Sequence, residues 1–203
     1  GSLDNLSFAP MVRRAPAAGE VEVAVKAVGL NFRDVLNTLG MLQEYYAAVL
    51  GIHRADAVAL GFECAGVITA VGEGVTAWTV GDRVMGIVNG AFAGYVTVPA
   101  TALAKMPAHF TFAEAATIPL AFLTAWYGLK ELAQLQAGER VLIHAAAGGV
   151  GQAALQIAQA SGAEVWATAS PTKWAFLRAQ GVDQLLNSRT LDFAEQIAQQ
   201  TAG

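Results

Sequence analysis

The first part of the chain alternates between apolar and polar or small residues in short runs. Val21, Val23 and Val25 are separated by single residues, which is the period of a half-buried β-strand. Turn-forming sequences such as Asn89-Gly90 separate these runs. Short strands at this spacing predict a small β-barrel or sandwich. Further strands are predicted at residues 66–71, 83–88 and 94–98, and short helices at residues 34–39 and 43–50.

The pattern changes after Pro107, where strands begin to alternate with helices. Thr111 and Glu114 have the spacing of a capping box, which predicts the start of a helix. Pro119 is expected to end that helix, and a second helix is expected over residues 122–133. Strand-like runs then cover residues 140–144, 164–169 and 184–187, and helical spacing covers residues 150–161, 172–180 and 192–200. This alternation is typical of a parallel, doubly wound sheet in an α/β fold.

A glycine-rich loop, AAAGGVG at residues 145–151, lies between a predicted strand and a predicted helix. Small residues at this position let the backbone approach a pyrophosphate, and the N-terminus of the helix supplies oriented N–H groups. The loop therefore predicts a dinucleotide site. The alternative is a tight strand-to-helix turn that binds nothing.

The end of the next strand indicates which dinucleotide binds. An Asp or Glu about 20 residues after the glycines usually contacts a free ribose 2′-hydroxyl. This sequence has Ser170 and Lys173 there instead, and Arg189 follows the third strand as a second cation. A hydroxyl and cations suit a 2′-phosphate, which favours NADPH over NADH. The alternative for Lys173 is a solvated residue on a helix surface.

Composition excludes several classes of protein. Apolar residues make up 55% of the chain and charged residues 14%, which rules out disorder as the main state. Twelve Lys and Arg against 16 Asp and Glu give a net charge of −4, too few cations for a nucleic-acid-binding face. The longest uncharged stretch, residues 141–163, is interrupted by polar residues and glycine, so no membrane span is expected. The one cysteine, Cys64, is expected in the core and suits a reducing cytoplasm.

Five ordered motifs carry a family resemblance: GLNFRDVL (residues 29–36), GFECAG (61–66), VGDRV (80–84), PLAFLTAWY (119–127) and the glycine loop. Together they resemble the medium-chain dehydrogenase/reductase superfamily, and most closely the enoyl reductase domains of modular polyketide synthases and of animal fatty acid synthase. The resemblance implies a GroES-like β-barrel substrate domain, expected at residues 1–114. A Rossmann domain is expected at residues 115–203, as its first half only, because three of six strands are present.

The resemblance also implies roles for particular residues. Asn31 and Thr124 are expected near the nicotinamide, although Asn31 could instead satisfy a turn and Thr124 could cap a kink after Pro119. The other implied cofactor-binding residues are Gly148, Gly149 and Val150 at the pyrophosphate and Ser170, Lys173 and Arg189 at the 2′-phosphate. The lysine and aspartate discussed as proton donors in the family would follow Gly203, so the catalytic acid stays unassigned and the sequence is expected to be a fragment.

Zinc can be addressed by the same resemblance. The zinc-dependent branch has Cys in the segment that matches residues 31–34, and His where Phe62 stands. A catalytic zinc needs three protein ligands, and phenylalanine cannot be one. A single cysteine also cannot form the four-Cys structural zinc site. The sequence therefore predicts a metal-free enzyme.

The expected function is NADPH-dependent reduction of an α,β-unsaturated acyl thioester carried by an acyl carrier protein, with neighbouring polyketide synthase domains as partners. Neither nucleic acid nor a membrane is expected as a partner, the location is expected to be cytoplasmic, and the oligomeric state is left open. Three alternatives remain: a quinone or enone reductase acting on free small molecules, a reductase that closes a cyclopropane ring on a γ-halogenated acyl thioester, and a non-catalytic NADPH-binding domain.

Overall fold

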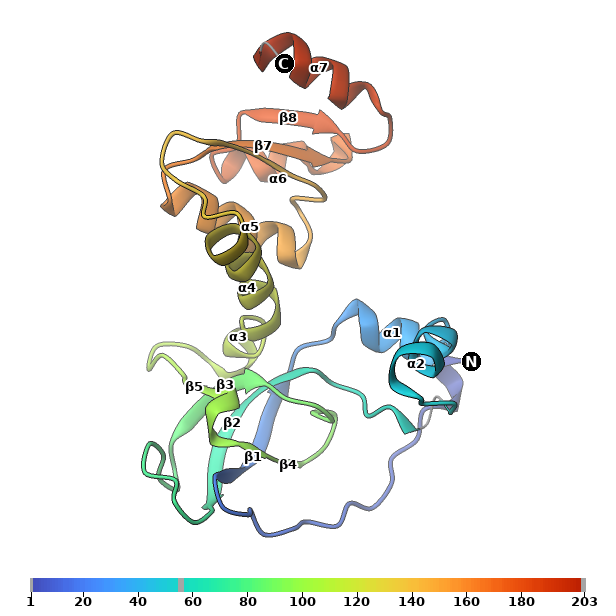
Figure 1. Ribbon diagram of the computed structural model, residues 1–203, viewed down its shortest axis with the longest axis vertical. Coiled ribbons are helices and arrows are strands. Elements are labelled where there is room, and N and C mark those ends of the chain that lie inside the picture. The colour runs from blue at the N-terminus through green and yellow to red at the C-terminus, as the bar shows by residue number, and fades with distance from the viewer. Residues whose placement is uncertain (1, 55–56, 202–203) are drawn as a thin grey trace. The chain divides into compact units, whose positions relative to one another are not determined.

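The computed structural model describes residues 2–54 and 57–201, and the chain divides into two compact units, residues 1–120 and 121–203 (Figure 1). The first unit contains an antiparallel sheet with short helices, and the second contains a parallel sheet with helices between its strands. The α/β fold class and the order of the two halves are therefore confirmed. The domain boundary expected between residues 114 and 115 stays a prediction.

The first unit is built on a five-stranded antiparallel sheet in the order β4-β1-β2-β3-β5. The alternation of valines in β1 has the predicted effect, because Val21 and Val23 are fully buried and pack with Ile68 and Val84. The strand β5 was not predicted, because it is too short to show a period. The strands are β1 (Glu20–Val28), β2 (Glu63–Val71), β3 (Arg83–Ile87), β4 (Tyr95–Pro99) and β5 (Leu103–Lys105).

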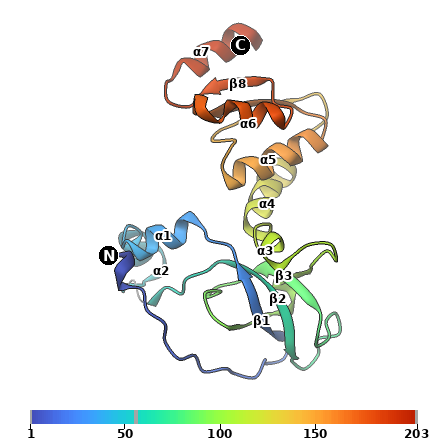
Figure 2. The ribbon, with the colours of Figure 1, turned by 180° about the vertical axis from the view of Figure 1, so that it is seen from behind.

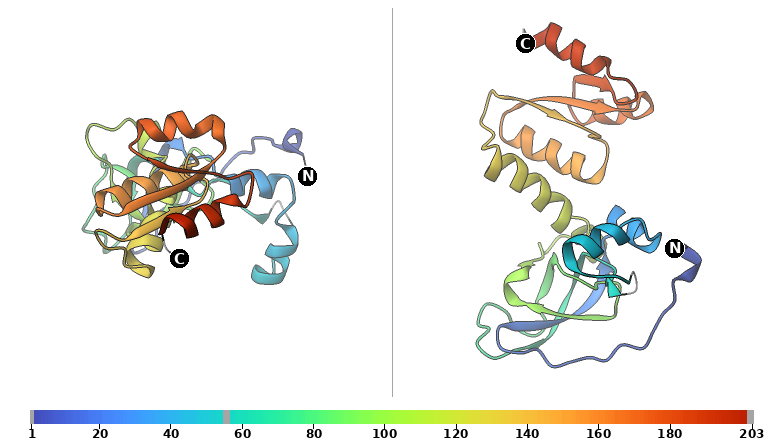
Figure 3. Two further views of the ribbon diagram at one scale, coloured as in Figure 1. Left: turned by 90° about the horizontal axis from the view of Figure 1, so that it is seen from above. Right: turned by 45° about the vertical axis from the view of Figure 1, so that its right-hand side comes forward.

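Short helices complete the first unit (Figures 1 and 3). The capping box of α3 is confirmed: the Thr111 side chain accepts a hydrogen bond from the Glu114 N–H at 3.2 Å, and the Glu114 carboxylate accepts one from the Thr111 N–H at 2.8 Å. The helical elements are η1 (Leu3–Asn5), α1 (Phe32–Thr38), α2 (Gln43–Leu50), η3 (Ala100–Ala102) and α3 (Phe112–Ala115).

The chain passes from the first unit to the second within α4 (Pro119–Trp126). Pro119 lies at the first helical position, where its missing N–H costs nothing, so the helix predicted from residue 122 begins three residues earlier. The predicted continuation to residue 133 is a π-helix, η4, over Tyr127–Leu132 rather than an α-helix. Within the described residues, no helix combines the length and the apolar composition that crossing a bilayer would require.

The second unit has a three-stranded parallel sheet in the order β6-β7-β8. Each strand is joined to its neighbour by helix, as the alternating pattern predicts. The helix α5 packs against β6 and β7, and α7 contacts the edge strand β8 (Figure 2). The elements are β6 (Arg140–Ile143), α5 (Gly149–Ala160), β7 (Glu164–Ala169), η5 (Pro171–Lys173), α6 (Trp174–Ala179), β8 (Gln184–Asn187) and α7 (Asp192–Thr201).

Two glycines in the first turn of α5 differ in how closely other atoms surround them. A Cβ at Gly151 would lie 2.5 Å from the Ala145 carbonyl oxygen and 2.7 Å from the Ala146 Cα, both of which are backbone atoms. A Cβ at Gly149 would meet nothing within 4 Å. Gly151 therefore permits close packing of α5 on the loop, and Gly149 leaves open space outside the helix.

We expect Gly151→Ala to lower the free energy of unfolding by about 1–3 kcal/mol, because the backbone it meets cannot give way cheaply. Gly149→Ala is the matched control and should raise stability by about 0.4–1 kcal/mol, because it restricts only the unfolded chain. Urea denaturation of the intact protein and both variants measures the difference. Equal transition midpoints for the two variants would contradict the proposed close packing.

Candidate active-site residues

The glycine loop is held in place by the neighbouring strand β7. The Thr168 side-chain oxygen lies 3.1 Å from Nδ1 of His144 and accepts a hydrogen bond from the Ala145 N–H at 3.3 Å. The Thr168 carbonyl accepts a further bond from the Ala146 N–H at 3.1 Å. These bonds fix Ala145 in the left-handed region, at φ 50°, which residues other than glycine rarely adopt. The loop is thus a preformed turn rather than a loose connection.

The turn presents the N-terminus of α5 to the outside. The Gly148 N–H donates to the Ala145 carbonyl at 2.8 Å, and Gly148 then caps the 12-residue helix that begins at Gly149. Gly148, Gly149 and Val150 are all exposed. The first N–H groups of a helix have no intrahelical acceptor. They are therefore available to an anion, and nothing lies within 4 Å of where a Cβ at Gly149 would stand.

The residues expected at a 2′-phosphate follow the carboxyl ends of the neighbouring strands, on the same side of the sheet as the glycine loop. Ser170 follows β7, and Arg189 follows β8, whose neighbouring Ser188 N–H donates to the Ala169 carbonyl at 3.1 Å. Lys173 is tied to this edge because its N–H donates to the Ser170 carbonyl at 2.9 Å. Both cationic side chains are exposed, and neither forms an ion pair with a described residue. The parallel strands thus bring the six predicted residues of this unit to one edge.

In the first unit, the residues around Asn31 are organised by a buried carboxylate that the sequence analysis missed. Glu63 is 4% exposed, and its Oε1 accepts a hydrogen bond from the Asn31 side-chain amide at 2.9 Å. Its Oε2 accepts one from the Leu120 N–H at 2.8 Å, near the N-terminus of α4. A Cβ at Gly29 would overlap the Glu63 side chain, which explains the glycine there. The available signal was an acidic residue inside the apolar GFECAG motif.

A second buried carboxylate, Asp34, lies on α1 and is 2% exposed. Its Oδ1 accepts a hydrogen bond from the Gly61 N–H at 2.7 Å, and its Oδ2 accepts one from the Asn31 N–H at 3.0 Å. Gly61 has φ +87°, a conformation that favours glycine. Asp34 therefore fixes the start of α1 against the segment that leads into β2.

Phe62 lies between Gly61 and Glu63, at the position where the zinc-dependent branch is expected to have a His ligand. Its ring is covered by the Arg33 guanidinium, whose Cζ lies 4.1 Å from the ring centroid. In residues 2–54 and 57–201, no group of three or more His, Cys, Asp and Glu side chains is arranged to hold a metal ion.

Cys64 is 1% exposed, as expected of a core residue, and burial raises the pKa of its thiol to about 11.

Thr124 lies on α4 with an exposed side chain. It belongs to the second compact unit, whereas Asn31 belongs to the first. The expectation that both approach one nicotinamide therefore stays a prediction.

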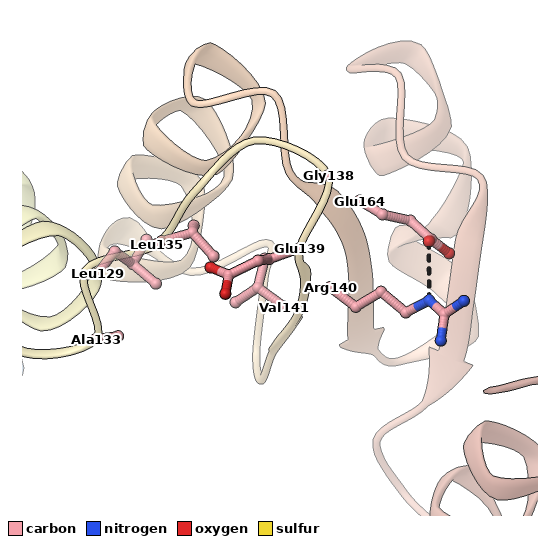
Figure 4. Close-up of a pocket in the computed structure, with 8 residues that line it drawn as sticks. All are labelled: Leu129, Ala133, Leu135, Gly138, Glu139, Arg140, Val141 and Glu164. Atoms are coloured by element: carbon pink, nitrogen blue, oxygen red, sulfur yellow. Dashed lines mark hydrogen bonds and ion pairs between the residues drawn. The ribbon is translucent and has the colours of Figure 1, made fainter. Parts of the chain in front are cut away.

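A shallow cavity of about 560 Å³ in the second unit lies at the other end of the strands (Figure 4). It is bordered by the first residues of β6 and β7, where Arg140 and Glu164 form an ion pair at 3.0 Å. Leu129 and Leu135 form its apolar side. Since the glycine loop follows the carboxyl end of β6, this cavity is separate from the candidate cofactor site.

Comparison with known proteins agrees with these features. Residues 17–108 match the family model of the alcohol dehydrogenase GroES-like domain. The crystal structure of the CurK enoyl reductase is 57% identical, with a TM-score of 0.96, and the match covers 100% of this chain and 61% of that one. The pikromycin polyketide synthase component PikAII of Streptomyces venezuelae is 47% identical over 200 residues, which are 95% of this chain and 5% of that protein.

Two further structures bear on the alternatives. The CurF cyclopropanase from the curacin A biosynthetic pathway is 48% identical, with a TM-score of 0.89, and the match covers 100% of this chain and 62% of that one. The Escherichia coli quinone oxidoreductase complexed with NADPH is 33% identical, with a TM-score of 0.80, and the match covers 98% of this chain and 58% of that one. The chain thus spans about three fifths of each of these solved structures.

The two hydrogen bonds of Glu63 predict the effect of a near-isosteric change. In Glu63→Gln the amide oxygen can accept from Asn31 or from Leu120, but the NH₂ group then faces the other donor. A buried donor without an acceptor costs about 1–3 kcal/mol, so the free energy of unfolding should fall by that amount. The matched control is Glu73→Gln, because Glu73 lies exposed in a turn. Equal denaturation midpoints for the two variants would show that the buried carboxylate contributes nothing to stability.

Proposed function

Because the chain belongs to the medium-chain dehydrogenase/reductase superfamily and its close homologues are enoyl reductase regions of polyketide synthases, we propose that it forms part of an NADPH-dependent enoyl reductase. The substrate is an α,β-unsaturated acyl thioester on an acyl carrier protein. The β-carbon receives a hydride and the α-carbon receives a proton. The observation that carries this proposal is the 57% identity with the CurK enoyl reductase across the whole of this chain.

The second unit supplies the cofactor contacts. NADPH supplies the hydride when it is bound. Gly148, Gly149 and Val150 hold its pyrophosphate through the free N–H groups of the first turn of α5. Lys173 and Arg189 pair with the 2′-phosphate, and the Ser170 hydroxyl donates a hydrogen bond to it. Two exposed cations without ion-pair partners in the described part of the chain support this assignment.

The first unit supplies Asn31, whose side chain contacts the nicotinamide in the proposed complex. Glu63 fixes the orientation of the Asn31 amide, so the side chain does not need to be ordered when the cofactor binds. Thr124, on α4, is proposed as a further nicotinamide contact on the family resemblance alone. Phe62 stands where the zinc-dependent branch has His, residues 31–34 include no Cys, and the Arg33 guanidinium over the Phe62 ring would repel a metal cation. We therefore propose a reaction without zinc.

Turnover by the intact protein that carries this sequence tests the proposal. NADPH oxidation should be faster with crotonyl-pantetheine than with a quinone, and treatment with a metal chelator should leave the rate unchanged. A γ-chlorinated, β-branched acyl thioester should give the chlorinated saturated product rather than a cyclopropane.

Each alternative has its own outcome in this experiment. Turnover of the quinone alone identifies a reductase of free small molecules, and a cyclopropane product identifies a ring-closing reductase. NADPH binding without turnover of any substrate identifies a non-catalytic domain. Loss of activity on chelation would contradict the metal-free mechanism.

The assignment of the 2′-phosphate site predicts a change in cofactor preference. Lys173→Glu should weaken NADPH binding by about tenfold to a hundredfold, since a charge-assisted hydrogen bond contributes about 1.5–3 kcal/mol. NADH binding should change little, because NADH lacks the phosphate. Arg178→Glu, a charge reversal on the same unit in α6, is the control and should affect both cofactors slightly. Fluorescence titration measures all four affinities, and an equal loss for NADPH and NADH in Lys173→Glu would refute the assignment.

A further inference from the structure

A cavity of about 450 Å³ lies within the first unit, where α1, α2 and the segments flanking β2 and β3 meet. Five of the residues that line it are apolar and are called its apolar wall: Leu50, Ile52, Val58, Ile87 and Val88. Arg33, Tyr46, Phe62 and Asn89 also line the cavity. The cavity therefore combines an apolar wall with one cationic group.

The guanidinium of Arg33 is held in a fixed position at this cavity. Its Nε donates a hydrogen bond to the Tyr46 hydroxyl at 3.0 Å. Its Cζ lies 4.1 Å from the Phe62 ring centroid and 5.6 Å from that of Tyr46. Both rings are buried, so the aromatic surface that carries the guanidinium is itself fixed.

The terminal nitrogens of Arg33 remain available. They form no hydrogen bond or ion pair with any residue in the described ranges, and the side chain is exposed. A guanidinium has five N–H donors, of which Nε–H is used here. The cavity thus presents free, preoriented donors with a positive charge, which suit an oxygen that carries or acquires negative charge.

This cavity is linked to Asn31 by three successive contacts between the same two segments. Asn31 bonds Glu63, Arg33 covers Phe62, and Asp34 bonds Gly61. The segments 31–34 and 61–63 therefore form one rigid element. The orientation of Arg33 and that of Asn31 are set by the same packing.

We propose that this cavity binds the acyl thioester, with the acyl chain against the apolar wall and the thioester carbonyl oxygen on the terminal N–H groups of Arg33. This inference rests on the proposed enoyl reductase function and adds a catalytic residue to it. An acyl chain matches the apolar wall. The carbonyl oxygen of the thioester can accept hydrogen bonds from the guanidinium.

The chemistry gives the guanidinium more than a binding role. Bound NADPH would supply a hydride and become NADP⁺; the hydride would form a C–H bond at the β-carbon while the π electrons of the C=C bond shift toward the carbonyl. The thioester oxygen then carries the negative charge of an enolate. A proton from solvent forms the new C–H bond at the α-carbon and restores the carbonyl. Arg33 binds the enolate oxygen more strongly than the neutral carbonyl, and this difference accelerates the reaction.

The test uses the intact protein with crotonyl-pantetheine, and butyryl-pantetheine as a saturated ligand that cannot be reduced. Arg33→Gln should lower kcat about 10²- to 10³-fold, the range found when an oxyanion donor is removed. It should weaken butyryl-pantetheine binding, measured calorimetrically without cofactor, several-fold. Arg33→Lys, which keeps the charge but loses the planar fork, should recover part of kcat. Lys26→Gln removes an exposed charge from the same unit outside the cavity, and should change neither quantity.

A second variant probes the apolar wall without depending on Arg33. Ala59 is exposed and borders the cavity, so Ala59→Phe should narrow it without disturbing the core. We expect KM to rise at least tenfold for longer enoyl thioesters and by a smaller factor for crotonyl-pantetheine, whose acyl chain is shorter. NADPH affinity should stay unchanged in every variant.

The outcomes separate this inference from the function on which it rests. If wild-type protein reduces crotonyl-pantetheine and Arg33→Gln keeps kcat and butyryl-pantetheine affinity within twofold, the role of Arg33 is refuted while the reductase function stands. Unchanged KM in Ala59→Phe overturns the placement of the acyl chain. Wild-type protein that reduces no enoyl thioester overturns the proposed function and this inference together.

Discussion

Two buried carboxylates determine how the first unit presents its candidate active-site residues. A carboxylate out of water is costly unless its oxygens are hydrogen-bonded, and Glu63 and Asp34 each accept two N–H bonds. Among the described residues, no buried side-chain nitrogen or oxygen lacks a partner. The donors are the Asn31 backbone and amide, the Gly61 N–H and the Leu120 N–H. The segments 31–34 and 61–63 cannot move apart without leaving these charges unsatisfied.

In the second unit, backbone hydrogen bonds rather than buried charges fix the candidate site. The strand β7 fixes the loop through both oxygens of Thr168, and the left-handed Ala145 turns the chain so that α5 begins at the sheet edge. Gly151 then lets the helix pack closely on the loop. The result is a row of N–H groups in the first turn, whose position follows from the βαβ connection and needs no specialised side chain. The residues that we propose distinguish between dinucleotides follow the next two strands and are mostly exposed.

The long-range bonds of the first unit and the local loop of the second explain what the sequence could and could not predict. Regular elements followed from local pattern: the strands Glu164–Ala169 and Gln184–Asn187 and the helix Gln43–Leu50 have their predicted bounds. The glycine loop was also recognisable, because the motif consists of contiguous residues between a strand and a helix. Cys64 was expected in the core, but the local pattern could not identify partners for the neighbouring Glu63. Its partners lie 32 and 57 residues away in the chain, and Gly61 lies 27 residues from Asp34. Such pairings are determined by tertiary packing and leave no local signal.

The same packing gives a physical reason for the type of reaction we propose. Where the zinc-dependent branch is expected to have His, this chain has Phe62, and the guanidinium of Arg33 lies over its ring and bonds Tyr46. A metal ion coordinates an alcohol oxygen directly and favours its loss of a proton, so zinc suits alcohol oxidation. A guanidinium instead donates N–H groups to an oxygen whose charge is delocalised, as in an enolate. In the proposed reaction, a fixed hydrogen-bond donor in place of a Lewis acid would retain positive charge in the site and favour reduction of a conjugated double bond. The buried carboxylates join the segments 31–34 and 61–63, which contain Arg33 and Asn31, so the proposed roles of these two residues depend on one packed element.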